Sequence, residues 1–157
     1  MSVIKSRYDD PENVQARKDQ IDPWIMYLIV RETLNMGVGK IAAQTGHAVG
    51  MIYENYSSLE KELDFLAFGD IPEGHKERLK IVDEKCHNFT TWKSKSFRKI
   101  VLRADDKEWE KLKRQLECYL VVDAGLTEVE AGSETVIALW PMLKSSAPPL
   151  VKRLRLL

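Results

Sequence analysis

The sequence predicts an α/β fold in which helices cover both faces of a four-stranded, mostly parallel sheet. Short apolar runs alternate along the chain with segments of helical periodicity, which is the pattern of strands connected by helices. The first run, residues 25–30, is nearly continuous and rich in β-branched residues, as expected for a strand buried on both faces. A chain of 157 residues, 44% of them apolar, is long enough for one such domain.

A helix is expected to follow the first strand, over residues 40–56. Its apolar positions recur at helical spacing and should face the sheet; they are Ile41, Ala48 and Ile52. Gly46 and Gly50 are predicted to permit close packing, because glycines that face solvent are costly inside a helix.

The second half of the chain predicts three further strands and two helices. The strands are residues 97–102, 119–122 and 135–140. Asp105 and Asp106 are good N-caps for a helix between the first two of these strands. The apolar positions of that helix lie at spacings of three and four, at Trp109, Leu112 and Leu116. Pro148 and Pro149 predict the start of a short last helix.

Two segments carry weaker patterns. Residues 1–22 are polar without an apolar period and are interpreted as a flexible N-terminal arm, with room for one short helical turn. Residues 57–96 are the hardest to assign. Leucines at spacings of four and three predict a short helix there, at Leu59, Leu63 and Leu66. Residues 70–74 predict a turn after it.

Charge and cysteine content limit the partners of the protein. Lys and Arg total 24, equal to Asp and Glu, so a basic surface for nucleic acid would require segregation of charge. Cys86 and Cys118 are not closely spaced, which indicates unpaired thiols in a reducing compartment. The histidines form no zinc-ligand pattern with them, because Cys86 and His87 are adjacent, so no metal is expected.

The chain is expected to be cytoplasmic, with no membrane partner. Residues 1–22 are charged and lack the apolar core of a signal peptide. No run approaches the roughly 20 apolar residues that a membrane-spanning helix needs.

Gly37 and Gly39 lie where the first strand gives way to a helix. Glycines at such a turn expose backbone amides, and the helix N-terminus adds a partial positive charge, so the turn can bind an anion. Lys40 places a full positive charge at the same point. A nucleotide-binding P-loop is excluded, because Leu34 and Ile41 stand where that motif requires Gly and Ser or Thr.

Lys40, Gln44 and His47 follow at spacings of four and three, which places them within a narrow arc of the helix. Aligned behind an anion-binding turn, they can form the wall of a polar site. A helix whose solvent face is polar explains the same periodicity and is the simpler interpretation from spacing alone.

Asp123 ends the third strand, at the position where ligand sites gather in open α/β sheets. If this strand is parallel and adjacent to the first, Asp123 faces Lys40 across one crevice, where Thr127, Ser133 and Thr135 add hydroxyls. A carboxylate near a lysine and a threonine can orient a water for attack on an ester, and the lysine can stabilise the oxyanion. An ordinary Asx turn whose hydroxyls satisfy the loop backbone fits the same residues equally well.

Two segments together resemble the blocks that mark type-2 peptidyl-tRNA hydrolases. The first block has the form VRxDLxMGKGKxAAQxxHA, and residues 30–48 read VRETLNMGVGKIAAQTGHA. The second has the form DAGxTxxxxGSxTV, and residues 123–136 read DAGLTEVEAGSETV without a gap. Two such blocks in the same order are far more specific than either alone.

The resemblance implies an α/β fold with a mixed, mostly parallel four-stranded sheet and a homodimer. It implies hydrolysis of the ester between peptide and tRNA in peptidyl-tRNA, without metal or cofactor. Lys40, Asp123 and Thr127 match the catalytic positions. The expected substrate-binding residues are Gly37, Gly39, Gln44, His47, Ser133 and Thr135.

The chain also departs from the family pattern. The family has lysine where this chain has Asn35 and Val38, and arginine where it has Leu126. Losing basic residues near an RNA weakens phosphate contacts and their salt dependence. In the expected domain of residues 23–157, the segment near 57–96 is an insert that is atypical for the family. A non-catalytic RNA- or protein-binding module on the same fold, and an enzyme for a different ester, are therefore the alternatives.

Overall fold

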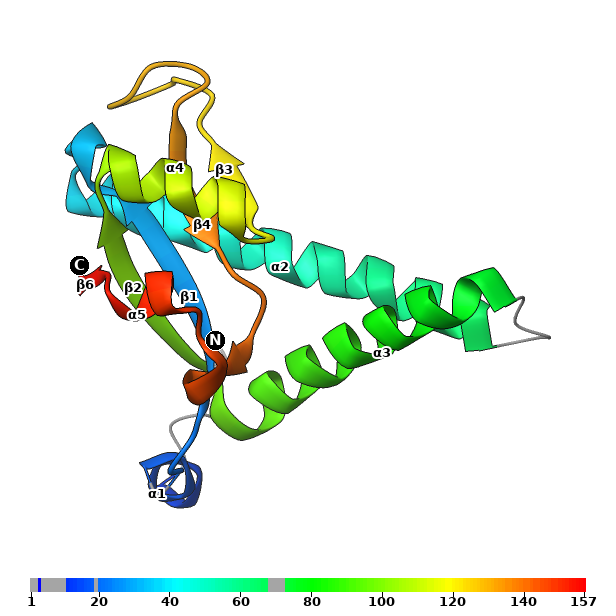
Figure 1. The fold of residues 1–157 in the computed structure, drawn as a ribbon. Coiled ribbons are helices and arrows are strands. Elements are labelled where there is room, and N and C mark those ends of the chain that lie inside the picture. Colours follow the sequence, from blue (N-terminus) through cyan, green and yellow to red (C-terminus); the bar gives the residue numbers. More distant parts are fainter. Residues whose placement is uncertain (1–2, 4–10, 19, 68–72) are drawn as a thin grey trace.

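A six-stranded mixed sheet forms the centre of the fold (Figure 1). The computed structural model describes residues 3, 11–18, 20–67 and 73–157. The strand order is β3-β4-β1-β2-β6, and β5 pairs with β1. The strands are β1 Trp24–Arg31, β2 Arg98–Ala104, β3 Tyr119–Val122, β4 Glu134–Ala138, β5 Met142–Leu143 and β6 Arg155–Leu156.

The α/β class and the mixed sheet are confirmed, but the expected count of four strands and the mostly parallel pairing are wrong. β1 pairs with β2 in parallel, whereas the β1–β4, β1–β5, β2–β6 and β3–β4 pairs are antiparallel. The additional strands β5 and β6 are each two residues long, too short to leave a periodic pattern. The apolar run of β1 indicates only that the strand is buried on both faces. Helices on both faces bury a strand in this way whether its neighbours are parallel or antiparallel, so the run does not predict the pairing direction.

Helices cover both faces of the sheet. Successive side chains of β1 point to opposite faces, and since nearly all of them are apolar, each face must be buried against helices. The helices on one face are α2 Val38–Ala67 and α3 Lys76–Thr91, and those on the other are α4 Asp106–Gln115 and α5 Pro149–Lys152. The β1 residues in the first core are Met26, Leu28 and Val30, and those in the second are Ile25, Tyr27 and Ile29.

The segment 57–96 forms most of a helical hairpin that extends beyond the sheet (Figure 1). The short helix expected at its start is the second half of α2, which runs without a break for 30 residues. α3 leads back to the sheet, and Arg78 on α3 donates two hydrogen bonds of 2.6 and 2.7 Å to Glu62 on α2. Most of the turn expected at 70–74 lies outside the described residues.

An aromatic cluster joins the base of the hairpin to the sheet. Phe89 on α3 is fully buried at its centre. Its ring centroid lies 4.1 Å from that of Tyr56, 5.0 Å from Tyr53, 5.5 Å from Trp92 and 5.8 Å from Trp140. Because Tyr53 and Tyr56 lie on α2 and Trp140 follows β4, the cluster fixes both helices of the hairpin to the domain.

The N-terminal segment contains one short helix, α1, at Pro11–Lys18. It contacts the chain near the start of β2, where Arg98 donates a hydrogen bond to the carbonyl of Arg17. Just beyond α1, Gln20 donates one of 2.8 Å to the carbonyl of Lys95. Residues 1–2, 4–10 and 19 lie outside the described residues, so the flexible arm stays a prediction.

The helix expected before β3 is α4, and its predicted cap is confirmed. The Asp105 carboxylate accepts from the amide of Glu108 at 2.8 Å, and Glu108 accepts from the amide of Asp105 at 3.0 Å. Trp109 and Leu112 are fully buried against the sheet. The indole of Trp109 donates a hydrogen bond of 2.9 Å to Glu134, which satisfies its polar atom.

The expected packing role of Gly46 and Gly50 is wrong. Both are exposed on α2, and a Cβ added at either would meet no atom within 4 Å. The face of α2 that packs inward carries Gln44, Ala48, Ile52 and Leu59 instead. Gly46 and Gly50 therefore carry the usual cost of glycine within a helix without a compensating contact.

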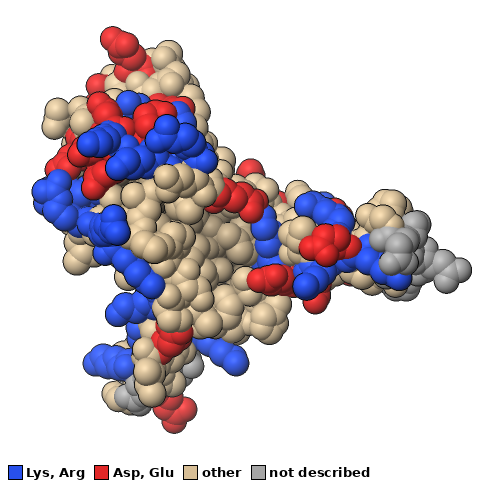
Figure 2. Space-filling model, viewed as in Figure 1, with Lys and Arg blue, Asp and Glu red and all other residues tan. Residues whose placement is uncertain are grey.

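The face seen in Figure 2 has regions of mixed charge and, down its left margin, a run of Lys and Arg with little Asp or Glu between them. Lys and Arg lie beside Asp and Glu over α4 and along the hairpin, with uncharged surface between them (Figure 2). Within the described residues, no helix is both long enough and apolar enough to span a bilayer.

Candidate active site

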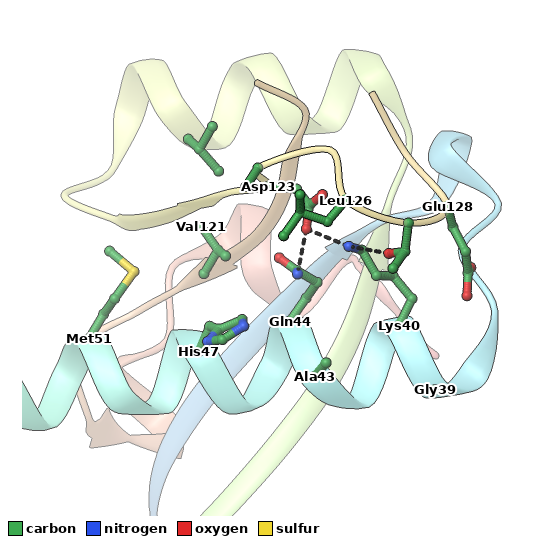
Figure 3. Close-up of a pocket in the computed structure, with 13 residues that line it drawn as sticks. Gly39, Lys40, Ala43, Gln44, His47, Met51, Val121, Asp123, Leu126 and Glu128 are labelled. Atoms are coloured by element: carbon green, nitrogen blue, oxygen red, sulfur yellow. Dashed lines mark hydrogen bonds and ion pairs between the residues drawn. The ribbon is translucent and has the colours of Figure 1, made fainter. Parts of the chain in front are cut away.

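The two turns that carry the predicted site residues lie at the same end of the sheet. β1 and β3 are not adjacent, which was the condition for a shared crevice, since β4 lies between them. β4 is antiparallel to both neighbours, so β1 and β3 still run in the same direction. Their carboxyl ends therefore lie at the same end of the sheet. There Lys40, in the first turn of α2, faces Asp123 (Figure 3).

Lys40 and Asp123 form a largely buried ion pair. The Lys40 Nζ lies 2.5 Å from Asp123 Oδ2, and the two side chains are 10% and 7% exposed. The same ammonium donates a hydrogen bond of 2.9 Å to Thr127 Oγ1 (Figure 3). The three residues predicted as catalytic are thus brought into direct contact.

The Asp123 carboxylate is held as an anion by donors on both of its oxygens. Gln44 Nε2 donates to Oδ2 at 2.8 Å, and the backbone amide of Gly125 donates to Oδ1 at 2.8 Å. The Lys40 ammonium, followed by the Gly125 amide, holds the pKa of the Asp123 carboxyl below its usual value. Asp123 is therefore ionised at neutral pH.

Position 125 in this turn can be occupied only by glycine. Its φ is +76°, in the left-handed region, and an added Cβ would lie 2.3 Å from the backbone nitrogen of Ala131. The tight approach of the chain to Ala131 directs the Gly125 amide onto Asp123.

Thr135 acts on the site through Gln44. Thr135 Oγ1 donates to Gln44 Oε1 at 2.7 Å, and both side chains are buried, at 0% and 4% exposure. Accepting this bond directs the amide group of Gln44 toward Asp123 (Figure 3). Thr135 does not reach the cavity surface, so its position suits a positioning residue rather than a substrate contact.

The turn before α2 differs from the expected glycine turn. Its left-handed residue is Asn35, with φ +47°. The amide of Gly37 donates a hydrogen bond of 2.6 Å to Glu128 Oε2, so the chain's own carboxylate occupies the amide expected to bind an anion. Glu128 was not predicted as a site residue, because nothing marks a contact between positions 91 residues apart.

A cavity of about 680 Å³ opens beside the ion pair, between α2 and the chain from β3 to Glu128. It is lined by the polar residues Lys40, Gln44, Asp123 and Thr127 and by Ala43, His47, Met51, Val121, Val122 and Leu126, of which Leu126 lies beside Asp123 (Figure 3). Gly39 also lines it, whereas Ser133 uses its backbone to bond Asp123 and Glu130. In the described parts of the chain, no group of His, Cys, Asp and Glu could hold a metal ion.

The arrangement leaves polar atoms available to a substrate. An ammonium has three N–H groups, and Asp123 and Thr127 receive two from Lys40, so the third can bind a substrate oxygen. Thr127 accepts from Lys40, which leaves its own O–H to donate. Asp123 Oδ1 accepts from Gly125 and can accept a second bond from a water.

Comparison with known proteins gives consistent matches. The family model described as "Peptidyl-tRNA hydrolase PTH2" matches residues 24–157. "Probable peptidyl-tRNA hydrolase 2" of Drosophila melanogaster is 28% identical over 142 residues, which cover 87% of this chain and 63% of that protein. "Peptidyl-tRNA hydrolase" of Methanocaldococcus jannaschii is 26% identical over 138 residues, which cover 84% of this chain and 98% of that protein.

The relatives differ in length. The chain spans less than two thirds of the Drosophila protein and 31% of "Probable peptidyl-tRNA hydrolase 2" of Caenorhabditis elegans, to which it is 30% identical over 121 residues covering 73% of this chain. The family match nevertheless extends from β1 to the last described residue, and it includes both turns of the site. The chain therefore belongs to the peptidyl-tRNA hydrolase PTH2 family.

Proposed function

We propose that this chain hydrolyses the ester bond between peptide and tRNA in peptidyl-tRNA. The observation that carries the proposal is the contact of Lys40, Asp123 and Thr127 at the wall of one cavity. By the resemblance of the two sequence blocks, all three positions match the family's catalytic residues. The chain is also similar to proteins named peptidyl-tRNA hydrolase.

The geometry supports a division of roles in direct attack by water. Asp123 Oδ1 and Thr127 position a water, whose oxygen adds to the ester carbonyl carbon. Lys40 binds the 3′ end of the tRNA and steadies the negative charge that develops on the carbonyl oxygen. The bond to the ribose oxygen then breaks. That oxygen takes one of the two protons of the attacking water, the other passes to solvent, and the peptide leaves as a carboxylate. Since the low pKa of Asp123 makes it a weak base, it acts mainly by orientation and charge.

The remaining predicted residues have supporting roles in this proposal. Gln44 holds Asp123, Thr135 holds Gln44, and Gly39 and His47 line the cavity that receives the substrate. We further propose that residues 23–157 form the catalytic domain and that the helical hairpin is its insert. We propose a homodimer from the resemblance alone. We propose the cytoplasm as its compartment from the two free thiols, Cys86 and Cys118, which fit a reducing environment.

Release of tRNA from N-acetyl-aminoacyl-tRNA tests the proposed activity. We expect the parent chain to release free tRNA, and Lys40→Ala and Asp123→Ala to lose the activity. Lys80→Ala and Asp83→Ala, which change exposed residues of the same types on α3, serve as controls and should keep it. No release by folded parent protein would favour the non-catalytic binding module.

Two exposed apolar residues, Val38 and Leu126, stand where the family has basic residues. We therefore expect weak contacts between this chain and the phosphates of tRNA. Val38 is 86% exposed and Leu126 is 87% exposed, so basic side chains fit at both positions. We expect Val38→Lys with Leu126→Arg to tighten tRNA binding and to steepen its salt dependence by about 0.7 to 0.9 logarithmic units for each phosphate gained. Filter binding across a salt series measures both quantities.

Val38→Gln with Leu126→Gln is the matched control, because it adds polar side chains without charge. Equal salt slopes for the basic and the neutral variants would show that neither position approaches the RNA.

A further inference from the structure

The strand that leads into Asp123, β3, lies at an open edge of the sheet. Within the described residues β3 has a neighbouring strand only on its β4 side. Val122, the last residue of β3, is 55% exposed. An edge strand presents unpaired N–H and C=O groups, and an extended chain can pair with them.

The direction of each backbone group on β3 follows from the bonds around Asp123. The Asp123 amide donates to the Ser133 carbonyl at 2.9 Å, and the Asp123 carbonyl accepts from Gly132 at 2.8 Å, so both face β4. Successive residues of a strand direct these groups to opposite sides. The register of the β3–β4 pair shifts between Val121 and Val122, but the Val121 carbonyl accepts a hydrogen bond of 3.2 Å from Thr135 Oγ1 on β4. Both neighbours of Val122 therefore direct their carbonyls toward β4, and the N–H and C=O of Val122 face the open edge.

The cavity reaches this edge. Val121 and Val122 both line it, although adjacent side chains on a strand point to opposite faces. A cavity that touches both must include the backbone edge between them. From Asp123 it continues toward Met51 along α2, and Figure 3 shows Val121 and Met51 facing each other across it. The result is a groove, the β3–α2 groove, that begins at the ion pair and follows the open edge.

The residues that line the β3–α2 groove suit a peptide better than RNA. Among the described residues that line it, Lys40 is the only Lys or Arg, and that ammonium is already paired with Asp123. In the part of the chain that the structure describes, no Phe, Tyr or Trp lines the groove to stack on a base. Its apolar residues along α2 and β3, Ala43, Met51 and Val121, instead offer unspecific contacts to side chains of any peptide.

We propose that the peptide part of the substrate binds in the β3–α2 groove as an additional strand on β3, an inference that rests on the proposed function. The polarity is fixed because the ester is at the carboxyl end of the peptide and must lie at Asp123, the carboxyl end of β3. The peptide therefore runs parallel to β3. Recognition through backbone groups admits peptides of any sequence.

Parallel pairing assigns two hydrogen bonds to Val122. In a parallel pair, one residue bonds two residues of the neighbouring strand that are separated by one. The Val122 carbonyl accepts from the N–H of the residue that bears the ester. The Val122 N–H donates to the carbonyl two residues earlier, which an N-acetyl-dipeptide has in its acetyl group and an N-acetyl-amino acid lacks.

Substrate length tests the second bond. We expect kcat/KM for N-acetyl-diglycyl-tRNA to exceed that for N-acetyl-glycyl-tRNA by about three- to tenfold, the effect of one net hydrogen bond. Val122→Pro removes only the outward N–H, at an edge position where proline is tolerated, and should bring this ratio close to one. Val122→Ala keeps the N–H and should keep the ratio.

The first bond is tested in the parent protein, independently of any variant. N-acetyl-sarcosyl-tRNA carries a methyl group on the nitrogen that would donate to the Val122 carbonyl, and its kcat/KM should be about three- to tenfold below that of N-acetyl-glycyl-tRNA. If all three substrates are cleaved with equal kcat/KM, strand addition is wrong and the hydrolase stands. An equal loss on all substrates in Val122→Pro would indicate that the groove holds the tRNA end instead. If the parent cleaves none of them, the proposed function itself fails.

Discussion

Asp123→Asn is expected to lower kcat on peptidyl-tRNA by about 10²- to 10³-fold, the usual effect of removing one electrostatic group from a preorganised site. Asparagine keeps the shape of the side chain but removes the charge that pairs with Lys40 and that, in the proposed mechanism, orients the water. Its amide nitrogen would also face either the Gly125 N–H or the Lys40 and Gln44 donors. Single-turnover hydrolysis of N-acetyl-aminoacyl-tRNA measures the change.

Two comparisons make the Asp123→Asn result specific. Asp83→Asn makes the same chemical change on the exposed surface of α3 and should leave kcat unaltered. Lys40→Met combined with Asp123→Asn should cost little more than either change alone, because residues that act as a unit are not additive. Full turnover by Asp123→Asn would remove Asp123 from the mechanism.

Phe89→Ala is expected to lower the free energy of unfolding by about 3 to 5 kcal/mol, the range for truncating a large core side chain. Phe89 is fully buried and its ring contacts aromatic residues of both α2 and the chain after β4. Its removal leaves a cavity where the hairpin joins the sheet. Urea denaturation followed by tryptophan fluorescence measures the loss.

Phe65→Ala, near the far end of α2, provides the matched control. That side chain is 78% exposed, so the same truncation should change the free energy of unfolding by less than about 0.5 kcal/mol. Equal losses at Phe65 and Phe89 would mean that the aromatic cluster does not fix the hairpin to the domain.

Elements whose formation depends on residues close together in the sequence were predicted from caps, apolar spacing and apolar runs. The capping box at Asp105 and the apolar spacing of Trp109 and Leu112 identified α4, since both depend on residues a few positions apart. Four strands were found from their apolar runs. β5 and β6 were missed because two residues carry no periodicity, and pairing direction was wrong because it depends on partners far along the chain.

The hairpin was missed for a different reason. Beyond the sheet, α2 and α3 bury only a narrow face against each other, with Leu59, Val82 and Cys86 in it. The remaining positions are free to be charged, so the apolar period is weak and resembles an irregular segment.

The candidate site was predicted in its residues but not in its connections. Spacing placed Lys40 and Gln44 on one arc of α2, and the ends of two strands placed Asp123 opposite them. That Thr135 acts through Gln44, and that Glu128 bonds the Gly37 amide, follow only from the folded chain. Such contacts join loops whose approach no periodicity encodes.

The position of β4 between β1 and β3 also sets the time at which this site can exist during synthesis. Lys40 and Asp123 are 83 residues apart, and the strand that bridges their two turns comes later in the chain than either. A growing chain that has emerged only as far as Asp123 lacks both that bridge and the Thr135 hydroxyl that orients Gln44. Contacts between residues far apart in the sequence form late, because closing the long loop between them costs chain entropy. The ion pair should therefore assemble only once residues up to Ala138 have left the ribosome, so a nascent copy has no functional site until most of it has been made.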